Sequence, residues 1–380
     1  MFGRRLNIVT IGGIKIGIDF SWVFIAILLT WTLAGGYFPF QFPHLSGETY
    51  WLMGALGMLG LFVCIVLHEL GHAVVAKHYK LPVEQITLFL FGGVAEIKKE
   101  PKSPKVEFLM AIAGPIVSVV LAAGLYVLAQ AGERLEWSVV AIGVISYLAT
   151  INLIIVVFNM IPAFPLDGGR VFRALLWWWK KDFSWATKVA ARLGSGFGFF
   201  LIFFGIFLLF ITGNIVMGVW LMILGFFLQK AASSSLVQFQ IGKELRGIKV
   251  SKFMTKDPIS VPPDITIREF IDEYLYQSHH HLYPVTEKRT LIGYVSLREV
   301  KSLTPEEWVK TPVKKAMVPA SSFRTISPDT SASQALALIQ EANLPALFVV
   351  EDKRLIGILT AQDLFKLISL KLELESDTDL

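Results

Sequence analysis

Long apolar runs separated by short polar segments fill the first part of the chain, and shorter mixed segments fill the rest. A helix needs about 20 mostly apolar residues to cross the hydrocarbon core of a bilayer. Six runs come close to that length or exceed it, near residues 20–34, 51–76, 108–128, 139–158, 195–211 and 215–228. The pattern predicts a polytopic α-helical membrane region with six transmembrane helices over residues 1–235.

Two short β-type segments interrupt this helical pattern. Residues 7–18 are rich in β-branched side chains around Gly12-Gly13, and residues 83–97 are similar around Gly92-Gly93. No arm of either segment is long enough to cross a bilayer, and a Gly-Gly pair favours a tight turn. We therefore expect one β-hairpin before the first transmembrane helix and another after the second.

The chain changes character near residue 248, where short strand-like and amphipathic segments replace the apolar runs. Two stretches of this region resemble each other, and their Leu-Ile-Gly triplets at 291–293 and 355–357 are 64 residues apart. A tandem repeat of this length indicates two small domains rather than a solenoid. We expect a soluble α+β region with a linker at 236–247, repeats at 248–303 and 312–370, and an acidic tail at 371–380.

The charges agree with a membrane part followed by a soluble part. Hydrophobic residues make up 54% of the chain and charged residues only 17%. Residues 1–235 carry 17 Lys and Arg against 11 Asp and Glu, and all 17 except Arg134 fall on one predicted side of the membrane. Basic loops face the cytoplasm. We therefore expect a multi-pass protein of the cell (inner) membrane with both termini cytoplasmic, and the positive charge requires no nucleic acid partner.

A His-Glu-x-x-His motif lies in the second predicted helix, at His68, Glu69 and His72. On a helix the two histidines lie one turn apart on one face, as two ligands of one zinc ion must. Glu69 lies between them, where a carboxylate can act as a base on water without being a ligand. Three ionisable residues within five positions of a transmembrane helix are costly, which favours a functional site.

Catalytic zinc usually takes three protein ligands, so a third ligand has to come from another segment. Asp167 is the best candidate, because it follows the fourth predicted helix beyond the helix-breaking Pro162 and Pro165. An irregular backbone at membrane depth is tolerated only where protein or water covers it, which suits a metal cavity. Asn159, just before this segment, is either a polar group that faces the substrate or a helix C-cap.

Together these two motifs, the second being Asn159-x-x-Pro-x-x-Pro-Leu-Asp167-Gly, resemble the site-2 protease family of intramembrane zinc metalloproteases. The resemblance implies that His68, His72 and Asp167 bind one Zn²⁺ per chain and that Glu69 is the catalytic base. It also implies substrates that are transmembrane segments of membrane proteins, cleaved within or near the lipid bilayer in regulated intramembrane proteolysis. Ser118 stands where asparagine is frequent in the wider family.

The repeated tail resembles a tandem pair of CBS domains, which usually bind an adenine nucleotide in the cleft between the repeats. Thr360-x-x-Asp363 matches the usual ribose and phosphate signature, and Ser296-x-x-Glu299 matches it less well. The resemblance therefore implies one ATP or AMP site at Thr360 and Asp363, which would modulate the protease. It also allows a homodimer through the CBS pair, or a purely structural role.

The competing function for the whole chain is a CBS-regulated membrane channel or transporter, since polar groups inside a bilayer can also line a pore. The spacing of the metal motif argues against this alternative.

Overall fold

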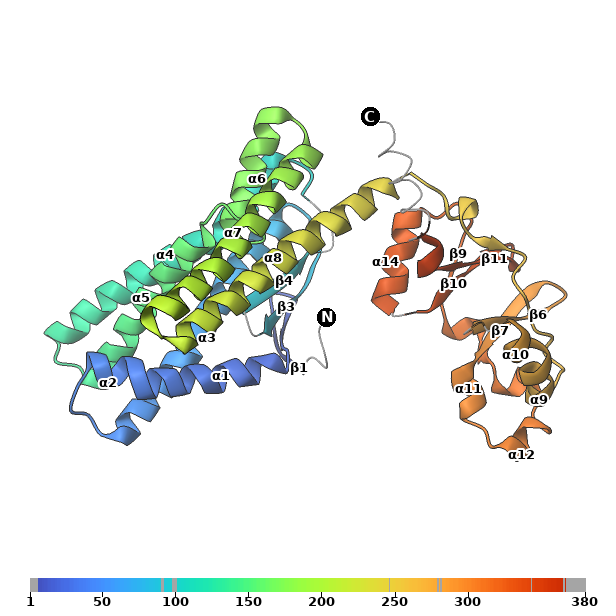
Figure 1. Ribbon diagram of the computed structural model, residues 1–380, viewed down its shortest axis with the longest axis horizontal. Coiled ribbons are helices and arrows are strands. Elements are labelled where there is room, and N and C mark those ends of the chain that lie inside the picture. Colours follow the sequence, from blue (N-terminus) through green and yellow to red (C-terminus); the bar gives the residue numbers. More distant parts are fainter. Residues whose placement is uncertain are drawn as a thin grey trace. The chain divides into compact units, whose positions relative to one another are not determined.

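The computed structural model describes residues 6–89, 92–97, 101–245, 247–278, 280, 282–342, 344–364 and 366. The chain divides into two compact units, residues 1–236 and 237–380 (Figure 1). Each unit has hydrophobic clusters of its own. They are described separately below as the membrane unit and the soluble unit.

Six helical segments of the described residues are long and apolar enough to cross a membrane, as predicted. They run beyond the apolar stretches that predicted them. Their elements are α1 (Ser21–Thr32) continued by a π-helical turn and α2 (Phe38–Gln41), α3 (Gly47–His78), α4 (Pro104–Arg134), α5 (Val139–Asn159), α7 (Phe183–Thr212) and α8 (Ile215–Glu244).

Polar residues mark where four of these helices begin. The side-chain oxygens of Ser46, Ser103, Ser138 and Asp182 each accept a hydrogen bond from the backbone N–H three residues later. Those N–H groups have no partner inside the helix, so each cap stabilises the first turn at a defined residue. α7 ends at Thr212 and is capped by Gly213, whose φ of 66° is the left-handed conformation that favours glycine.

A four-stranded sheet of order β1-β2-β3-β4 belongs to the membrane unit. β1–β2 and β3–β4 are antiparallel pairs, and β2 runs parallel to β3. Both predicted hairpins are therefore present, although Gly92 and Gly93 begin β4 instead of forming the turn. The strands are β1 (Leu6–Ile11), β2 (Ile14–Ile18), β3 (Val83–Phe89) and β4 (Gly92–Ile97).

The helices α3 and α4 approach each other closely at the level of the histidine motif. A Cβ atom on Gly71 of α3 would lie 3.0 Å from the carbonyl oxygen of Ala113 and 2.9 Å from a methyl group of Val117, both on α4. α4 also contacts α5 and the short helix α6 (Asp167–Lys180). It therefore forms the scaffold between the helix that carries the histidines and the helix that carries Asp167.

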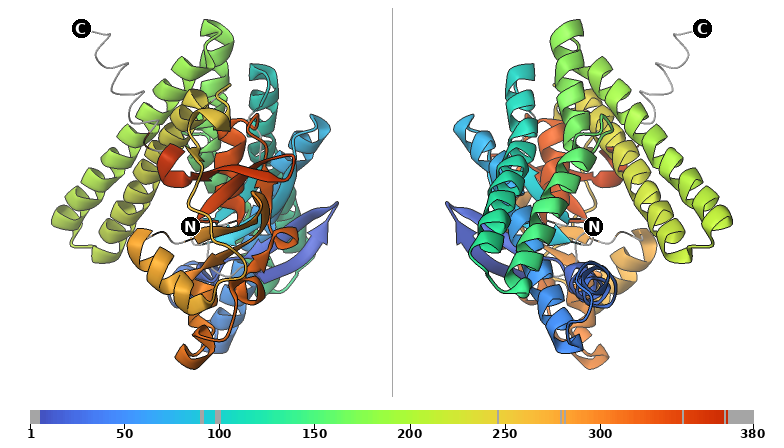
Figure 2. Two further views of the ribbon diagram at one scale, coloured as in Figure 1. Left: turned by 90° about the vertical axis from the view of Figure 1, so that its right-hand side faces the viewer. Right: turned by 90° about the vertical axis from the view of Figure 1, so that its left-hand side faces the viewer.

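α7 and α8 run side by side as a helical hairpin, and four glycines lie at the contact between them (Figure 2). A Cβ atom on Gly205 would lie 2.7 Å from the carbonyl oxygen of Gly218, and one on Gly225 would lie 2.5 Å from that of Gly198. Small residues allow such close backbone approach between helices in a bilayer. The two helices are consequently packed as one element.

The soluble unit has an α+β fold with one seven-stranded sheet, of order β6-β7-β11-β10-β9 with β5 on β11 and β8 on β7. Its helices and strands are β5 (Thr255–Lys256), α9 (Ile267–Phe270), α10 (Tyr276–Ser278), β6 (Leu282–Glu287), β7 (Thr290–Ser296), α11 (Leu297–Lys301), α12 (Pro305–Trp308), α13 (Val313–Ala316), β8 (Val318–Pro319), β9 (Thr325–Ile326), α14 (Ala332–Ala342), β10 (Ala346–Glu351) and β11 (Arg354–Thr360).

The two repeats exchange their leading segments. Thr255 of β5, at the start of the first repeat, pairs with Ile358 in the second, and Val318 of β8 pairs with Tyr294 in the first. The stretch expected as a linker at 236–247 is helical as far as Glu244, and Leu245 is fully buried in the hydrophobic cluster of the second repeat. The stretch before the first repeat therefore packs against the second repeat instead of forming a free linker.

Candidate metal centre

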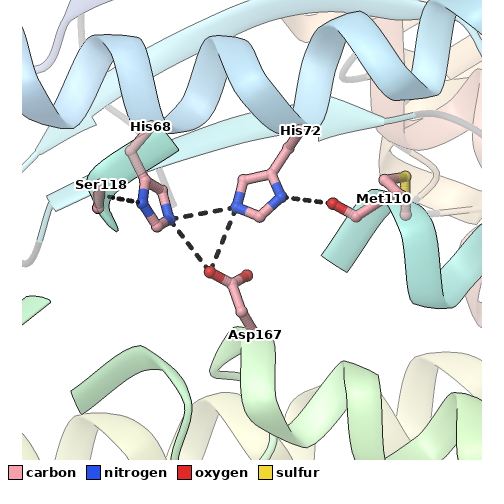
Figure 3. Close-up of polar contacts among 5 residues, drawn as sticks. All are labelled: His68, His72, Met110, Ser118 and Asp167. Atoms are coloured by element: carbon pink, nitrogen blue, oxygen red, sulfur yellow. Dashed lines mark hydrogen bonds and ion pairs between the residues drawn. The ribbon is translucent and has the colours of Figure 1, made fainter. Parts of the chain in front are cut away.

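Three potential metal ligands from two distant segments meet in the membrane unit. His68 and His72 lie one turn apart on α3 with only 4% of their surface exposed, and Asp167 is the first residue of α6. Asp167 Oδ2 lies 3.1 Å from His68 Nε2 and 3.2 Å from His72 Nε2, and the two Nε2 atoms are 3.2 Å apart (Figure 3). The structure thus brings together all three residues expected to bind zinc.

The geometry of these atoms fits a zinc ion. Ligand atoms about 2.05 Å from a tetrahedral metal are roughly 3.3 Å apart, close to the observed triangle. A Cβ atom added to Gly114 would lie 2.2 Å from His72 Nε2 and 2.6 Å from His68 Nε2, so that glycine leaves open space beside both nitrogens. Two nitrogens and a carboxylate oxygen are also a donor set that zinc prefers.

The other nitrogen of each imidazole is held by α4. His72 Nδ1 donates to the carbonyl oxygen of Met110 at 2.7 Å, which leaves Nε2 free of a proton in the neutral ring. His68 Nδ1 lies 2.9 Å from the hydroxyl oxygen of Ser118, which is fully buried. Such contacts orient metal-binding histidines.

Sequence reasoning missed this role of Ser118 and treated the residue only as a departure from the family. One signal could have revealed it. Ser118 lies four residues after Gly114, so both face the same side of one helix turn.

An irregular segment delivers Asp167 to the histidines. α5 ends at Asn159, and the segment that follows continues to Leu166. A Cβ atom on Gly168 would lie 2.3 Å from the carbonyl oxygen of Met160, and one on Gly169 would lie 2.3 Å from the backbone nitrogen of Phe164. Both glycines are therefore required for the segment to fold back on the start of α6, as the prolines and glycines of its sequence predicted.

A cavity of about 390 Å³ opens beside two of the three ligands. Glu69 and Asn159, both predicted to act in catalysis, line it together with His68 and Asp167. A Cβ atom on Gly93 would lie 2.6 Å from Glu69 Cγ, so β4 passes directly over the Glu69 side chain. The remaining wall includes Leu224, Phe227 and Leu228 of α8.

Comparison with known proteins bears on the function of both units. The sequence profile of Peptidase family M50 matches residues 56–133 and 129–203, and that of the CBS domain matches residues 250–305 and 313–370. Rip3 of Mycobacterium tuberculosis, whose name describes a zinc metalloprotease, is 34% identical over 371 residues, covering 94% of this chain and 91% of Rip3. The chain belongs to Peptidase family M50.

Other relatives of this M50 peptidase carry similar names. Zinc metalloprotease MJ0392 of Methanocaldococcus jannaschii is 31% identical over 337 residues, covering 88% of this chain and 89% of the relative. A solved site-2 protease from the same organism is 29% identical and covers 61% of this chain and 95% of its own, with a TM-score of 0.43. From the family profiles, the two curated relatives and its six apolar helices, the protein is a multi-pass membrane zinc metalloprotease with tandem CBS domains. Both of these relatives are named as metalloproteases, not as channels or transporters.

The predicted nucleotide residues of the CBS pair do not line the described cavity of the soluble unit, although Thr360 pairs with Ala346, which does. Thr360 donates from its backbone N–H and its hydroxyl to Asp363, at 2.9 and 2.7 Å. The cavity, of about 450 Å³, is instead lined by Ser296 and Glu299, the weaker match to the signature. The assignment of Thr360 and Asp363 stays a prediction.

Proposed function

We propose that His68, His72 and Asp167 hold the catalytic zinc and that Glu69 is the general base. The observation that carries this proposal is the triangle of ligand atoms next to a cavity that Glu69 also lines. Zinc, when bound, polarises a peptide carbonyl and lowers the pKa of water to about 7. Glu69 would accept the proton of that water and later deliver it to the leaving amine. Asn159, on the same cavity, would donate a hydrogen bond to the substrate backbone.

The test is cleavage of a peptide that contains a transmembrane segment, by purified protein in detergent. E69Q should lower the rate roughly 10²–10⁴-fold, the usual contribution of a general base, while the zinc content stays unchanged. E48Q is the matched control, because Glu48 lies at the start of the same helix, away from the cavity. Undiminished cleavage by E69Q, or purified active protein without zinc, would falsify the assignment.

We further propose that the substrate binds as an added strand on β4. A transmembrane helix satisfies its carbonyl groups internally, so a peptide bond becomes accessible only after local unwinding. Among the described residues, β4 pairs with β3 alone, and its residues Gly92 and Gly93 line the cavity beside Glu69. An edge strand offers backbone hydrogen bonds to an extended peptide in the correct place for cleavage.

For the soluble unit we propose an adenine nucleotide, ATP or AMP, in the cavity at Ser296 and Glu299. The rings of Tyr294, Phe323 and Phe348 cluster at its edge, with Tyr294 and Phe323 centroids 5.0 Å apart, and offer faces to a base. Arg298 and Arg324 supply guanidinium groups for phosphate. The volume is in the range of ordinary ligand sites.

Isothermal titration of the full-length protein with ATP and AMP tests this site. R324Q should weaken binding about tenfold or more, because a charge-assisted hydrogen bond to phosphate is lost. R354Q is the control, since Arg354 is exposed and does not line the cavity. No heat with either nucleotide removes the proposal, and loss of heat in T360A but not in R324Q returns the site to Thr360 and Asp363.

We also propose that both termini are cytoplasmic in the cell membrane, on the evidence of the basic loops. Labelling of single cysteines in a C64A background checks this orientation, with a cysteine at Lys181 or Lys230 expected to react only from the cytoplasmic side. Dimerisation through the CBS pair stays a prediction, for which the mass of the purified protein is the measurement.

A further inference from the structure

A buried ion pair lies behind the metal ligands and takes no part in the chemistry proposed above. Glu107 of α4 is fully buried and Arg173 of α6 is 7% exposed. Arg173 Nε donates a hydrogen bond to Glu107 Oε1 at 2.6 Å, and Arg173 Nη2 forms an ion pair with the same oxygen. Glu107 Oε2 is also buried and has no hydrogen-bond partner in the part of the chain that the structure describes.

Stability alone does not account for such a pair. Moving two charges out of water has a large desolvation penalty, and apolar replacements of similar volume often leave a protein equally stable. Leaving one carboxylate oxygen without a partner adds to that penalty. We therefore look for a role in which geometry matters, because a hydrogen-bonded ion pair fixes the relative orientation of two side chains and an apolar contact does not.

The pair connects the parts of the metal site that come from different segments. Arg173 lies six residues after Asp167 on α6, and Glu107 lies three residues before Met110, whose carbonyl group holds His72. The contact therefore spans from the helix of the carboxylate ligand to the helix that orients a histidine ligand.

The guanidinium of Arg173 also contacts the irregular segment that precedes Asp167. It lies 5.2 Å from the centroid of the Phe164 ring and 5.0 Å from that of Phe183. Phe164 is in the irregular segment before Asp167, and Phe183 begins α7. A Cβ atom on Gly194 of α7 would lie 1.8 Å from the carbonyl oxygen of Phe164, so this segment is enclosed from that side as well.

A second arginine extends the charged group towards the site. Arg170, one turn after Asp167, interacts electrostatically with Arg173, Glu107, Asp167 and Glu69. The interactions with the three carboxylates are attractive and the one with Arg173 is repulsive, so Arg170 adds a second positive charge of α6 near Glu107 of α4.

We propose that Arg173 and Glu107 are positioning residues, which fix Asp167 at the distance from His68 and His72 that zinc requires. This inference rests on the proposed zinc site. One hydrogen bond and one ion pair from the same guanidinium to Glu107 Oε1 restrict both the translation and the rotation of α6 relative to α4, and Phe164 transfers that constraint to the segment before Asp167. Without the pair, α6 would still pack, but Asp167 would lose its exact placement.

The experiment compares E107Q, R173K and the apolar double variant E107L/R173L in the full-length protein. Zinc affinity is measured by competition with a chelator, and the visible spectrum of the cobalt-substituted protein reports the coordination geometry. We expect zinc binding roughly 10–100-fold weaker, as for other groups behind metal ligands, and an altered cobalt spectrum. R192Q, at an exposed arginine of α7, is the control and should match the unmodified protein.

The double variant separates positioning from stability. It should unfold at nearly the same temperature as the unmodified protein and still bind zinc weakly, whereas a purely structural pair would leave the cobalt spectrum unchanged in every folded variant. If the double variant does not fold, E107Q decides, because it keeps the shape of Glu107. An unchanged spectrum in E107Q overturns the inference.

D167N distinguishes this inference from the zinc site on which it rests. If D167N loses zinc but the pair variants do not, only the positioning role fails. If D167N itself binds zinc as before, the proposed metal site is wrong.

Discussion

Gly114 leaves the space beside the two histidines in which the proposed zinc ion would lie. A Cβ atom at this position would lie 2.2 Å from His72 Nε2, within the space that a metal ion and its ligands need. No larger residue is compatible with both histidines in their observed positions.

We therefore predict that G114A abolishes zinc binding and proteolysis. G124A is the matched control, because Gly124 is on the same helix and a Cβ atom there would meet nothing within 4 Å. Zinc content after dialysis and cleavage of the transmembrane peptide are the measurements. Full zinc occupancy in G114A would contradict the prediction, because it would mean that α4 can shift away from the two histidines without weakening zinc binding.

Ser118 gives a second prediction at the scale of single residues. Its hydroxyl group lies 2.9 Å from His68 Nδ1 and is the described polar partner of that nitrogen. S118A should weaken zinc binding about 10–100-fold, since the imidazole loses the group that orients it. Chelator competition measures the change, and S118T, which keeps the hydroxyl, should retain most of the affinity. Equal affinities for S118A and the unmodified protein would contradict the role.

At the scale of elements, the edge strand β4 leads to a prediction about substrate binding. Val94 pairs with Thr87 of β3. V94P should abolish cleavage and leave the zinc content unchanged, because proline lacks the N–H that a strand donates and disturbs the strand edge. A proline at Leu90 would test the same idea, but Leu90 lies outside the described residues. V9P, in the opposite edge strand β1, should retain activity, and normal turnover by V94P would rule out strand addition.

The glycine contact between α7 and α8 provides another prediction. α8 supplies Leu224, Phe227 and Leu228 to the wall of the cavity, so its distance from α7 affects the shape of the site. G205A should lower kcat/KM severalfold with zinc retained, because the added methyl group would lie 2.7 Å from a backbone oxygen. G196A on the same helix, where a Cβ atom meets nothing within 4 Å, should behave like the unmodified protein.

At the scale of the whole molecule, two units with separate hydrophobic clusters should unfold separately. The proposed zinc site belongs to the folded membrane unit, so a zinc concentration 100 times its Kd should stabilise that unit by about 2.7 kcal/mol. Removing zinc should therefore lower one thermal transition, and adding the nucleotide should raise the other. Scanning calorimetry in detergent measures both. A single transition that shifts with either ligand would show that the units unfold together.

Much of this organisation could be predicted from the sequence, because it depends on local rules. A continuous apolar run of about 20 residues forms a helix in a bilayer, because a helix satisfies the backbone groups within the segment. The spacing of His68 and His72 places them on one helix face, and the prolines and glycines around Asp167 predict an irregular segment. The tandem repeat was visible because its two copies share residues at a constant spacing.

Only the tertiary structure decided how distant residues meet. Ser118 is 50 residues from His68, and Arg173 is 66 residues from Glu107, so no local pattern pairs them. The exchange of leading segments between the repeats and the helical linker depend on which hydrophobic surface each segment buries. Sequence periodicity determines which face of an element is apolar or polar, whereas the neighbour of that face is selected by packing of the whole chain.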